Sequence, residues 1–63
     1  MLNENLLTLR KLHKLSQEDV AEKIGVSRQA VAKWENGETA PDIYNCKALA
    51  DLFDVSLDDL VNF

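Results

Sequence analysis

Glycine, proline, cysteine and aromatic residues are all scarce in this sequence of 63 residues. With a single cysteine, no disulfide can form within the chain, which is typical of proteins in a reducing cytoplasm. No apolar stretch approaches the roughly 18 residues that a membrane-spanning helix needs. The N-terminal segment also lacks the apolar run and cleavage site of a signal peptide. We therefore expect a cytoplasmic protein without a membrane-spanning segment.

The small size of the chain excludes several classes of protein. A chain of this length buries about 60 % of the surface that it exposes when unfolded, so its core is thin. A wide substrate cleft or a Rossmann-type cofactor domain would not fit. Hydrophobic residues make up 46 % of the chain and charged residues 29 %, which are the proportions of a folded domain. We expect one globular domain over residues 1–63, either as the whole protein or as one domain of a longer one.

Groups that support metal binding or catalysis are almost absent. His13 is the only histidine and Cys46 the only cysteine, and two such residues are too few for a metal site. Cys46 also falls on the inner face of an expected helix, where its thiol would be buried. We therefore predict no metal, no cofactor and no enzymatic activity.

The hydrophobic pattern has helical periodicity along the whole chain, and no segment shows the strict alternation of a strand. Capping and turn residues divide this pattern into five short helices. The expected boundaries are Asn3 to Lys14 for the first helix, Ser16 to Gly25 for the second, Ser27 to Gly37 for the third, Asp42 to Asp54 for the fourth, and Ser56 onward for the fifth. The sequence thus predicts an all-α fold, a compact five-helix bundle.

Local signals support these boundaries. Ser16 is followed three residues later by Asp19, which is similar to a capping box with Asp in place of Glu. Ser56 and Asp59 have the same spacing before the fifth helix. The expected inner face of the fourth helix consists of Ile43, Cys46, Leu49, Ala50 and Phe53.

The second and third helices meet the physical requirements of a helix-turn-helix. Ala21 is small at the point where the second helix must approach its partner closely. Gly25 permits a sharp turn between the two helices. Val31 and Trp34 would hold the third helix on the core. Residues 17–37 are therefore the candidate functional segment.

The opposite face of the third helix is polar and surrounds the small Ala32. Arg28 there can form two hydrogen bonds with guanine, Gln29 can do the same with adenine, and Lys33 can reach guanine or a phosphate. Gln17 begins the second helix, where backbone N–H groups and the helix dipole favour a phosphate. Any solvated helix can present such a face, so the third helix alone does not establish DNA binding.

The segment LSQEDVAEKIGVSRQAVAKWENG resembles the helix-turn-helix of the Cro/phage-repressor-like (XRE-type) DNA-binding family. The similarity continues through ETAPDIYNCKALADLFDVSLDDLV, and so covers nearly the whole chain. It implies a lambda-repressor-like bundle whose third helix lies in the DNA major groove. It further implies that Gln17 and Asn36 contact backbone phosphates. The groove-facing residues that it implies are Ser27, Arg28, Gln29 and Lys33.

The resemblance also implies an ion pair between Arg10 and Glu35, which would tie the first helix to the third. An acidic side chain beside a DNA-reading face would otherwise be electrostatically unfavourable. We expect a structural pair of small net stability, in which loss of one partner costs about 3–5 kcal/mol.

These residues predict a transcriptional regulator, most simply a repressor, that binds specific sequences of double-stranded DNA. A single small domain makes few base contacts, so specific binding usually needs two copies on a two-fold-related site. We therefore expect a homodimer. The candidate dimer contact is the apolar C-terminal end, which consists of Leu57, Leu60, Val61 and Phe63.

The formal charge of −4 is unevenly distributed along the chain. Residues 1–37 carry six basic and five acidic side chains, whereas residues 38–63 carry one basic and six acidic side chains. The acidity thus belongs mainly to the part that would not read bases. We expect weak, salt-sensitive non-specific DNA binding, with specificity from a few contacts of the third helix.

Two alternative functions remain open at this point. The chain could be an antitoxin-type DNA-binding protein whose main partner is a toxin, and the sequence does not separate this function from a repressor. It could also be a protein-interaction module that has kept the fold and lost DNA binding. The acidic balance favours that module, whereas the polar face of the third helix opposes it.

Overall fold

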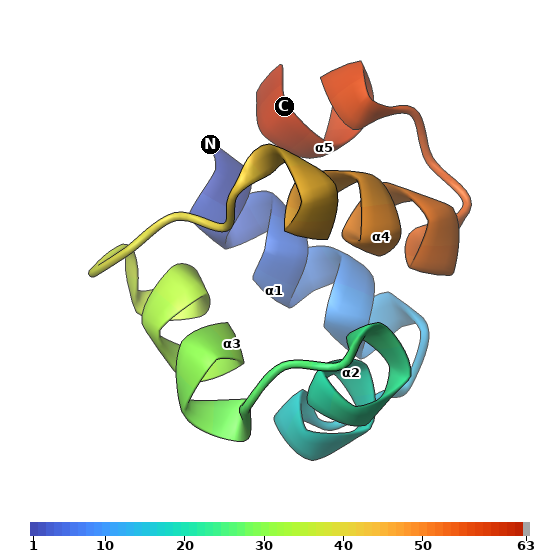
Figure 1. The fold of residues 1–63 in the computed structure, drawn as a ribbon. Helices are drawn as coiled ribbons and strands as arrows, with labels where there is room; N and C mark the ends of the chain where they lie inside the picture. Colours follow the sequence, from blue (N-terminus) through green and yellow to red (C-terminus); the bar gives the residue numbers. More distant parts are fainter. Residues whose placement is uncertain (63) are drawn as a thin grey trace.

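The computed structural model describes residues 1–62, which form five helices and no strand. These are α1 (Leu2–Leu12), α2 (Gln17–Ile24), α3 (Arg28–Asn36), α4 (Ile43–Phe53) and α5 (Leu57–Asn62). In Figure 1, α1 crosses the middle of the molecule, α2 and α3 lie below it, and α4 and α5 lie above it. The all-α five-helix bundle predicted from the sequence is confirmed. Within residues 1–62, none of the five helices could span a lipid bilayer.

Side-chain caps begin α2, α3, α4 and α5 where the sequence predicts them. Ser16 and Asp19 form a reciprocal capping box: Asp19 N–H donates to the Ser16 hydroxyl and Ser16 N–H to the Asp19 carboxylate, each over 2.9 Å. The other capping side chains, each bound to a backbone N–H of its helix, are Ser27, Asp42 and Ser56. Such caps satisfy N–H groups that have no partner within the helix, so they define where each helix starts.

The first helix differs from the prediction at both ends. It begins at Leu2 rather than after Asn3, because Leu2 belongs to the apolar stripe that packs against the core. Asn3 is therefore inside the helix, and its side-chain amide lies close to Gly37, where a Cβ would come within 3.4 Å of it. The helix ends at Leu12, and Lys14 adopts a left-handed conformation with φ of 58°.

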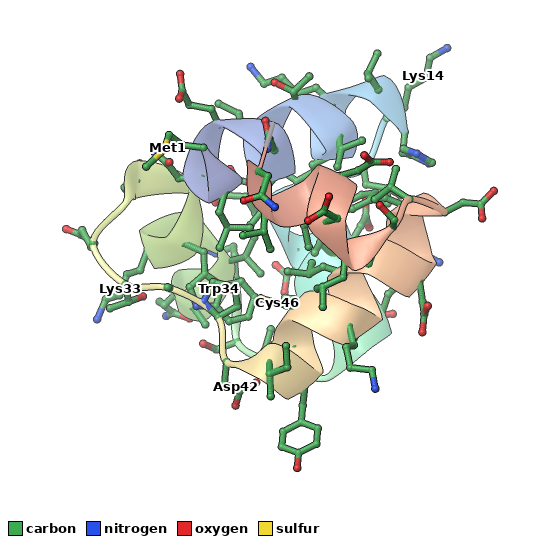
Figure 2. The ribbon with its side chains drawn as sticks, turned by 90° about the horizontal axis from the view of Figure 1, so that it is seen from above. Met1, Lys14, Lys33, Trp34, Asp42 and Cys46 are labelled. Carbon is green, nitrogen blue, oxygen red and sulfur yellow. The ribbon has the colours of Figure 1, made fainter. Side chains whose placement is uncertain are left out.

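The core consists of residues from all five helices. Its buried members are Leu6, Val20, Ala21, Val31, Trp34, Cys46, Leu49, Ala50, Phe53 and Leu60. Figure 2 shows Trp34 and Cys46 pointing toward the interior, whereas Lys33 projects outward. The prediction that Ile43 joins the inner face of α4 is wrong, since its side chain is 55 % exposed. Ile43 is the first residue of α4, directly after its cap, and so lies at the edge of the bundle.

The last helix packs back onto the first. The Asn5 side-chain amide donates a 3.0 Å hydrogen bond to the Leu60 carbonyl, which joins α1 to α5. The Leu60 side chain is completely buried in the core. Its assignment to a dimer contact is therefore wrong, because it covers the core of its own chain. Val61 is 39 % exposed and Leu57 is half-buried, while Phe63 lies outside the described residues.

Candidate DNA-reading surface

The segment between α2 and α3 has the compact turn that the sequence predicts. Gly25 adopts a left-handed conformation with φ of 76°, and Val26 N–H then donates to the Ala21 carbonyl over 2.9 Å. Ser27 caps the next helix at once. Ala21 is buried, so the two helices approach each other closely through a small side chain. This geometry places α3 directly against α2.

The two faces of α3 are sharply different. Val31 and Trp34 are buried against the core, with exposed fractions of 0 % and 7 %. Arg28, Gln29 and Lys33 are all exposed on the outside of the helix. Between them lies the half-buried Ala32, whose small side chain does not project beyond the helix surface. The structure thus brings together three long side chains that can donate hydrogen bonds on one exposed face of α3.

Two further residues of the expected DNA-binding set lie at the ends of α3. Ser27 is exposed, and its hydroxyl oxygen accepts the N–H of Ala30 over 3.1 Å. The hydroxyl proton is not used by this bond, so Ser27 can cap the helix and still donate to another group. Asn36 is exposed at the opposite end, next to Gly37.

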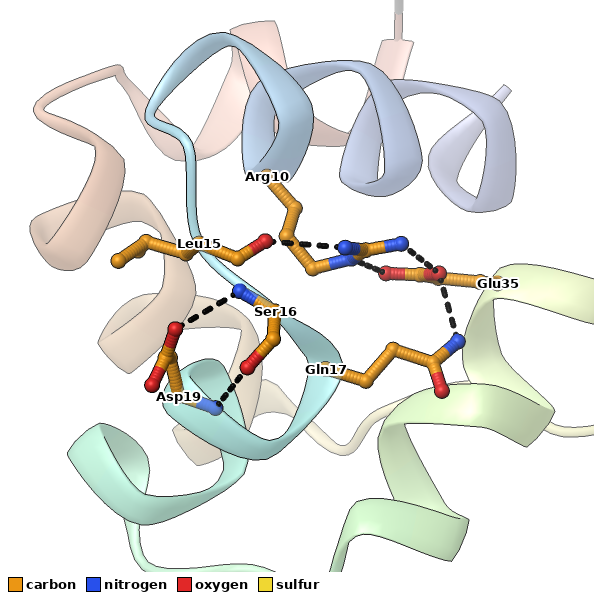
Figure 3. Close-up of polar contacts among 6 residues, drawn as sticks. All are labelled: Arg10, Leu15, Ser16, Gln17, Asp19 and Glu35. Carbon is orange, nitrogen blue, oxygen red and sulfur yellow. Dashed lines mark hydrogen bonds and ion pairs between the residues drawn. The ribbon is translucent and has the colours of Figure 1, made fainter.

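A buried ion pair lies beneath this surface (Figure 3). Arg10 Nε donates to Glu35 Oε2 over 2.6 Å, and its Nη2 donates to Oε1 over 3.1 Å. The side chains are only 13 % and 4 % exposed, respectively. A third nitrogen, Nη1, donates to the Leu15 carbonyl over 2.9 Å. The expected pair is therefore present, and it joins α1, α3 and the α1–α2 connection.

Gln17 belongs to the same network, which sequence reasoning missed. Its side-chain nitrogen Nε2 donates to Glu35 Oε1 over 3.0 Å. The residue is half-buried at the start of α2. The sequence gives no signal for this bond, because the two residues lie 18 positions apart and only the packing of α2 beside α3 brings them together.

Acidic side chains are exposed on α2, the helix that packs against α3. Glu18, Asp19 and Glu22 are all exposed there. The pKa of Asp19 is lowered because its carboxylate accepts the Ser16 backbone N–H and lies against the Ser16 hydroxyl. Asp19 therefore keeps its negative charge in mildly acidic solution, and it contributes to the acidic flank of α2.

The remaining candidate groups for chemistry are isolated. Cys46 is buried, and burial raises the pKa of its thiol, with a further increase from the nearby Asp42. A raised pKa disfavours the reactive thiolate. The exposed His13 lies against the ring of Phe53, with centroids 5.2 Å apart. Within residues 1–62, no cluster of three His, Cys, Asp or Glu residues has the arrangement of a metal site.

Comparison with known proteins identifies relatives of the whole bundle. The HTH-type transcriptional activator BcrR of Enterococcus faecalis is 40 % identical over 60 residues, which are 95 % of this chain and 29 % of BcrR. The antitoxin PezA of Streptococcus pneumoniae is 33 % identical over 61 residues, 97 % of this chain and 39 % of PezA. The chain thus spans less than half the length of either relative.

A solved structure matches over almost its full length. The P22 c2 repressor protein, crystallised in complex with a synthetic operator, superposes with a TM-score of 0.93 and is 32 % identical. The match covers 98 % of this chain and 94 % of the repressor chain. In addition, a family profile described as helix-turn-helix matches residues 6–60. This chain therefore belongs to the Cro/phage-repressor-like helix-turn-helix family.

Proposed function

We propose that the protein is a transcriptional regulator that binds specific sequences of double-stranded DNA and represses transcription by occupying an operator. The observation that carries this proposal is the two-sided α3, buried through Val31 and Trp34 and exposed through Arg28, Gln29 and Lys33. An α-helix fits the major groove of B-form DNA, where each base pair presents its own pattern of donors and acceptors. The similarity to the operator-bound P22 c2 repressor supports the same use of α3.

Within this proposal, the polar residues have distinct tasks. Arg28 and Gln29 read base edges, because each can form two hydrogen bonds with one base. Lys33 binds a base edge or a phosphate. Ser27 faces the groove beside them, and the contacts to the DNA backbone come from Gln17 and Asn36.

We further propose that two copies bind one operator as a homodimer. A domain 24 × 22 × 20 Å in size reaches few base pairs, so two half-sites about one helical turn apart provide the specificity. The surface for this contact consists of the half-buried Leu57 and the exposed Val61, while Phe63 of the expected contact lies outside the described residues. The proposal includes a cytoplasmic location, where the protein would meet its operator, and it calls for neither catalysis nor a cofactor.

Selection of bound duplexes from a random DNA pool tests the proposal directly. Purified protein should enrich a two-fold-related sequence at low salt. The matched control is Arg28→Ala with Gln29→Ala, which leaves the buried face of α3 intact and should abolish the enrichment. Failure of the unaltered protein to enrich any sequence at low salt would overturn the proposal.

A second candidate function is that of an antitoxin, and the likeness to PezA favours it. An antitoxin of this kind would also bind DNA, so DNA selection does not separate the two functions. Co-purification with the product of a neighbouring gene, together with relief of that product's toxicity, would do so. A repressor without a toxin partner would show neither effect.

A further inference from the structure

We propose that Glu35 is a positioning residue for DNA-backbone binding: its carboxylate holds the Gln17 side-chain amide so that one amide N–H points to a phosphate. This inference rests on the proposed function. It gives the Arg10–Glu35 pair a second task besides joining α1 to α3.

The contacts of Glu35 make its carboxylate a fixed acceptor. Oε2 receives Arg10 Nε over 2.6 Å, while Oε1 receives both Arg10 Nη2 over 3.1 Å and Gln17 Nε2 over 3.0 Å. Arg10 is itself held by the Leu15 carbonyl over 2.9 Å. Because the Glu35 side chain is 4 % exposed, water has little access to replace these donors. The Gln17 amide is therefore attached to a rigid, buried anchor.

The chemistry of the two groups determines the orientation of the amide. A carboxylate only accepts hydrogen bonds, so the nitrogen of Gln17 must face Glu35 and the amide oxygen must face away. Figure 3 shows this arrangement, with the Gln17 oxygen directed away from the carboxylate. The nitrogen carries two hydrogens, and one of them binds Glu35. The second hydrogen diverges from the first and is the donor available to a ligand.

The location of this donor suits a phosphate. Gln17 is the first residue of α2, where the helix dipole is positive, although Ser16 already caps Asp19 N–H and the exposed Glu18 and Asp19 carboxylates lie in the same turn. The half-buried side chain lies between this helix end and α3, whose outward face carries Arg28, Gln29 and Lys33. In the complex proposed above, a duplex that receives α3 in its major groove brings a strand of phosphates over the same edge. A phosphate oxygen is an acceptor, which matches the second amide hydrogen.

The ion pair also removes an electrostatic obstacle. An unpaired carboxylate at this position would repel a phosphate over a short distance. Arg10 neutralises Glu35 through two hydrogen bonds, so Glu35 can orient Gln17 without repelling DNA. Holding the amide in place before binding also reduces the rotamer freedom that Gln17 loses on the duplex.

A double-mutant cycle tests the inference with the operator sequence found by selection. In one background the buried pair is replaced by Arg10→Met with Glu35→Leu, an apolar exchange of a kind that often preserves stability. Gln17→Ala is then made in both backgrounds. The exchange alone and Gln17→Ala alone should each weaken DNA binding about three- to tenfold. The combined variant should bind no more weakly than Gln17→Ala alone.

Two controls separate this role from a purely structural one. Gln29 does not contact Glu35. Gln29→Ala should therefore weaken DNA binding by the same factor in the unaltered protein and in the variant that lacks the buried pair. The dependence of affinity on salt should stay the same in the cycle, because Gln17 carries no charge and releases no counterion. Additive effects of the exchange and Gln17→Ala would overturn the inference. If the selection succeeds but the two changes act independently, the proposed function stands and only this inference fails. If the protein binds no DNA at all, both the proposed function and this inference fail.

A second measurement uses the unaltered protein, in case the exchanged variant does not fold. The two Gln17 amide protons can be assigned in NMR spectra by their loss in Gln17→Ala. One proton should be shifted downfield in the free protein by its bond to Glu35 and should stay there when DNA is added. The other proton should move on addition of DNA. Loss of the Glu35-bound signal on DNA, or no movement of the second proton, would contradict the inference.

Discussion

The guanidinium of Arg10 and the carboxylate of Glu35, 25 positions apart in sequence, face each other through two parallel hydrogen bonds of 2.6 and 3.1 Å. This bidentate geometry is the strong form of an arginine–carboxylate contact. It joins the first helix to the C-terminal end of α3, the helix that carries the candidate DNA-reading face. The orientation of α3 in the bundle therefore depends in part on one buried polar contact.

Removal of one partner should be far more damaging than removal of both. We expect Glu35→Ala to lower the free energy of unfolding by about 3–5 kcal/mol, since it leaves the Arg10 charge buried without its counter-charge. Urea denaturation measures this change. The exchange of both partners for Met and Leu is the matched control and should retain most of the stability. Unchanged stability of Glu35→Ala would show that the pair does not support the fold.

Gln29→Ala should reduce discrimination between bases. We expect the affinity for the preferred operator to fall by about 1–3 kcal/mol, with relaxed preference at one or two base pairs. Binding to a panel of single-base operator variants measures this effect. An equal loss on every sequence would mean that Gln29 does not read bases.

Lys33→Ala distinguishes base contact from phosphate contact. If Lys33 neutralises a phosphate, the slope of log affinity against log salt should decrease by about one unit, with base preference unchanged. If it reads guanine, preference at one position should change as well. Fluorescence anisotropy over a range of salt concentrations measures both quantities. No change in affinity, slope or preference would remove Lys33 from the interface.

The capping box of α2 should make stability depend on pH. The pKa of Asp19 is below its ordinary value of 3.8, chiefly because the carboxylate accepts the Ser16 backbone N–H. Its stabilising contribution is therefore fully present above pH 3.8 and is lost as pH falls through the lowered, folded-state pKa. Asp19→Ala should lower the melting temperature at pH 7, and the difference from the unaltered protein should disappear in strong acid.

Two variants control this experiment. Glu18→Ala removes a neighbouring charge in the same helical turn and should change the melting temperature less. Ser16→Ala removes the other half of the box and should cost about 0.5–2 kcal/mol. If Asp19→Ala still melted at a lower temperature than the unaltered protein in strong acid, the negative charge of Asp19 would not be the stabilising feature.

Truncation of two adjacent residues of α5 should have very different effects on stability. Leu60→Ala should destabilise the chain by about 2–5 kcal/mol, because it opens a cavity in the core. Val61→Ala, at a site 39 % exposed, should change stability little. If Val61 contributes to the dimer, its loss should weaken cooperative binding to the two-fold operator, measured with full and half operators. Equal destabilisation by both variants would contradict the assignment of Leu60 to the core.

Much of the architecture follows from local chemistry and was predictable. The caps Ser16, Ser27 and Ser56 and the left-handed Gly25 are decided within a few residues, because a cap needs only a side-chain oxygen near the first turn. The buried face of α3 follows from its 3.6-residue period, which places Val31 and Trp34 together. The exposed arrangement of Arg28, Gln29 and Lys33 is the other half of the same pattern.

The tertiary structure decided what periodicity cannot express. Whether Ile43 or Leu60 is buried depends on which helix covers it, and Leu60 is covered because α5 folds back onto α1 and α4. The bond from Gln17 to Glu35 depends likewise on how α2 lies beside α3. The pairing of Arg10 with Glu35 was suggested by family resemblance alone. The sequence by itself thus determined the helices and their polar faces, whereas long-range packing selected the buried polar contacts behind the DNA-reading surface.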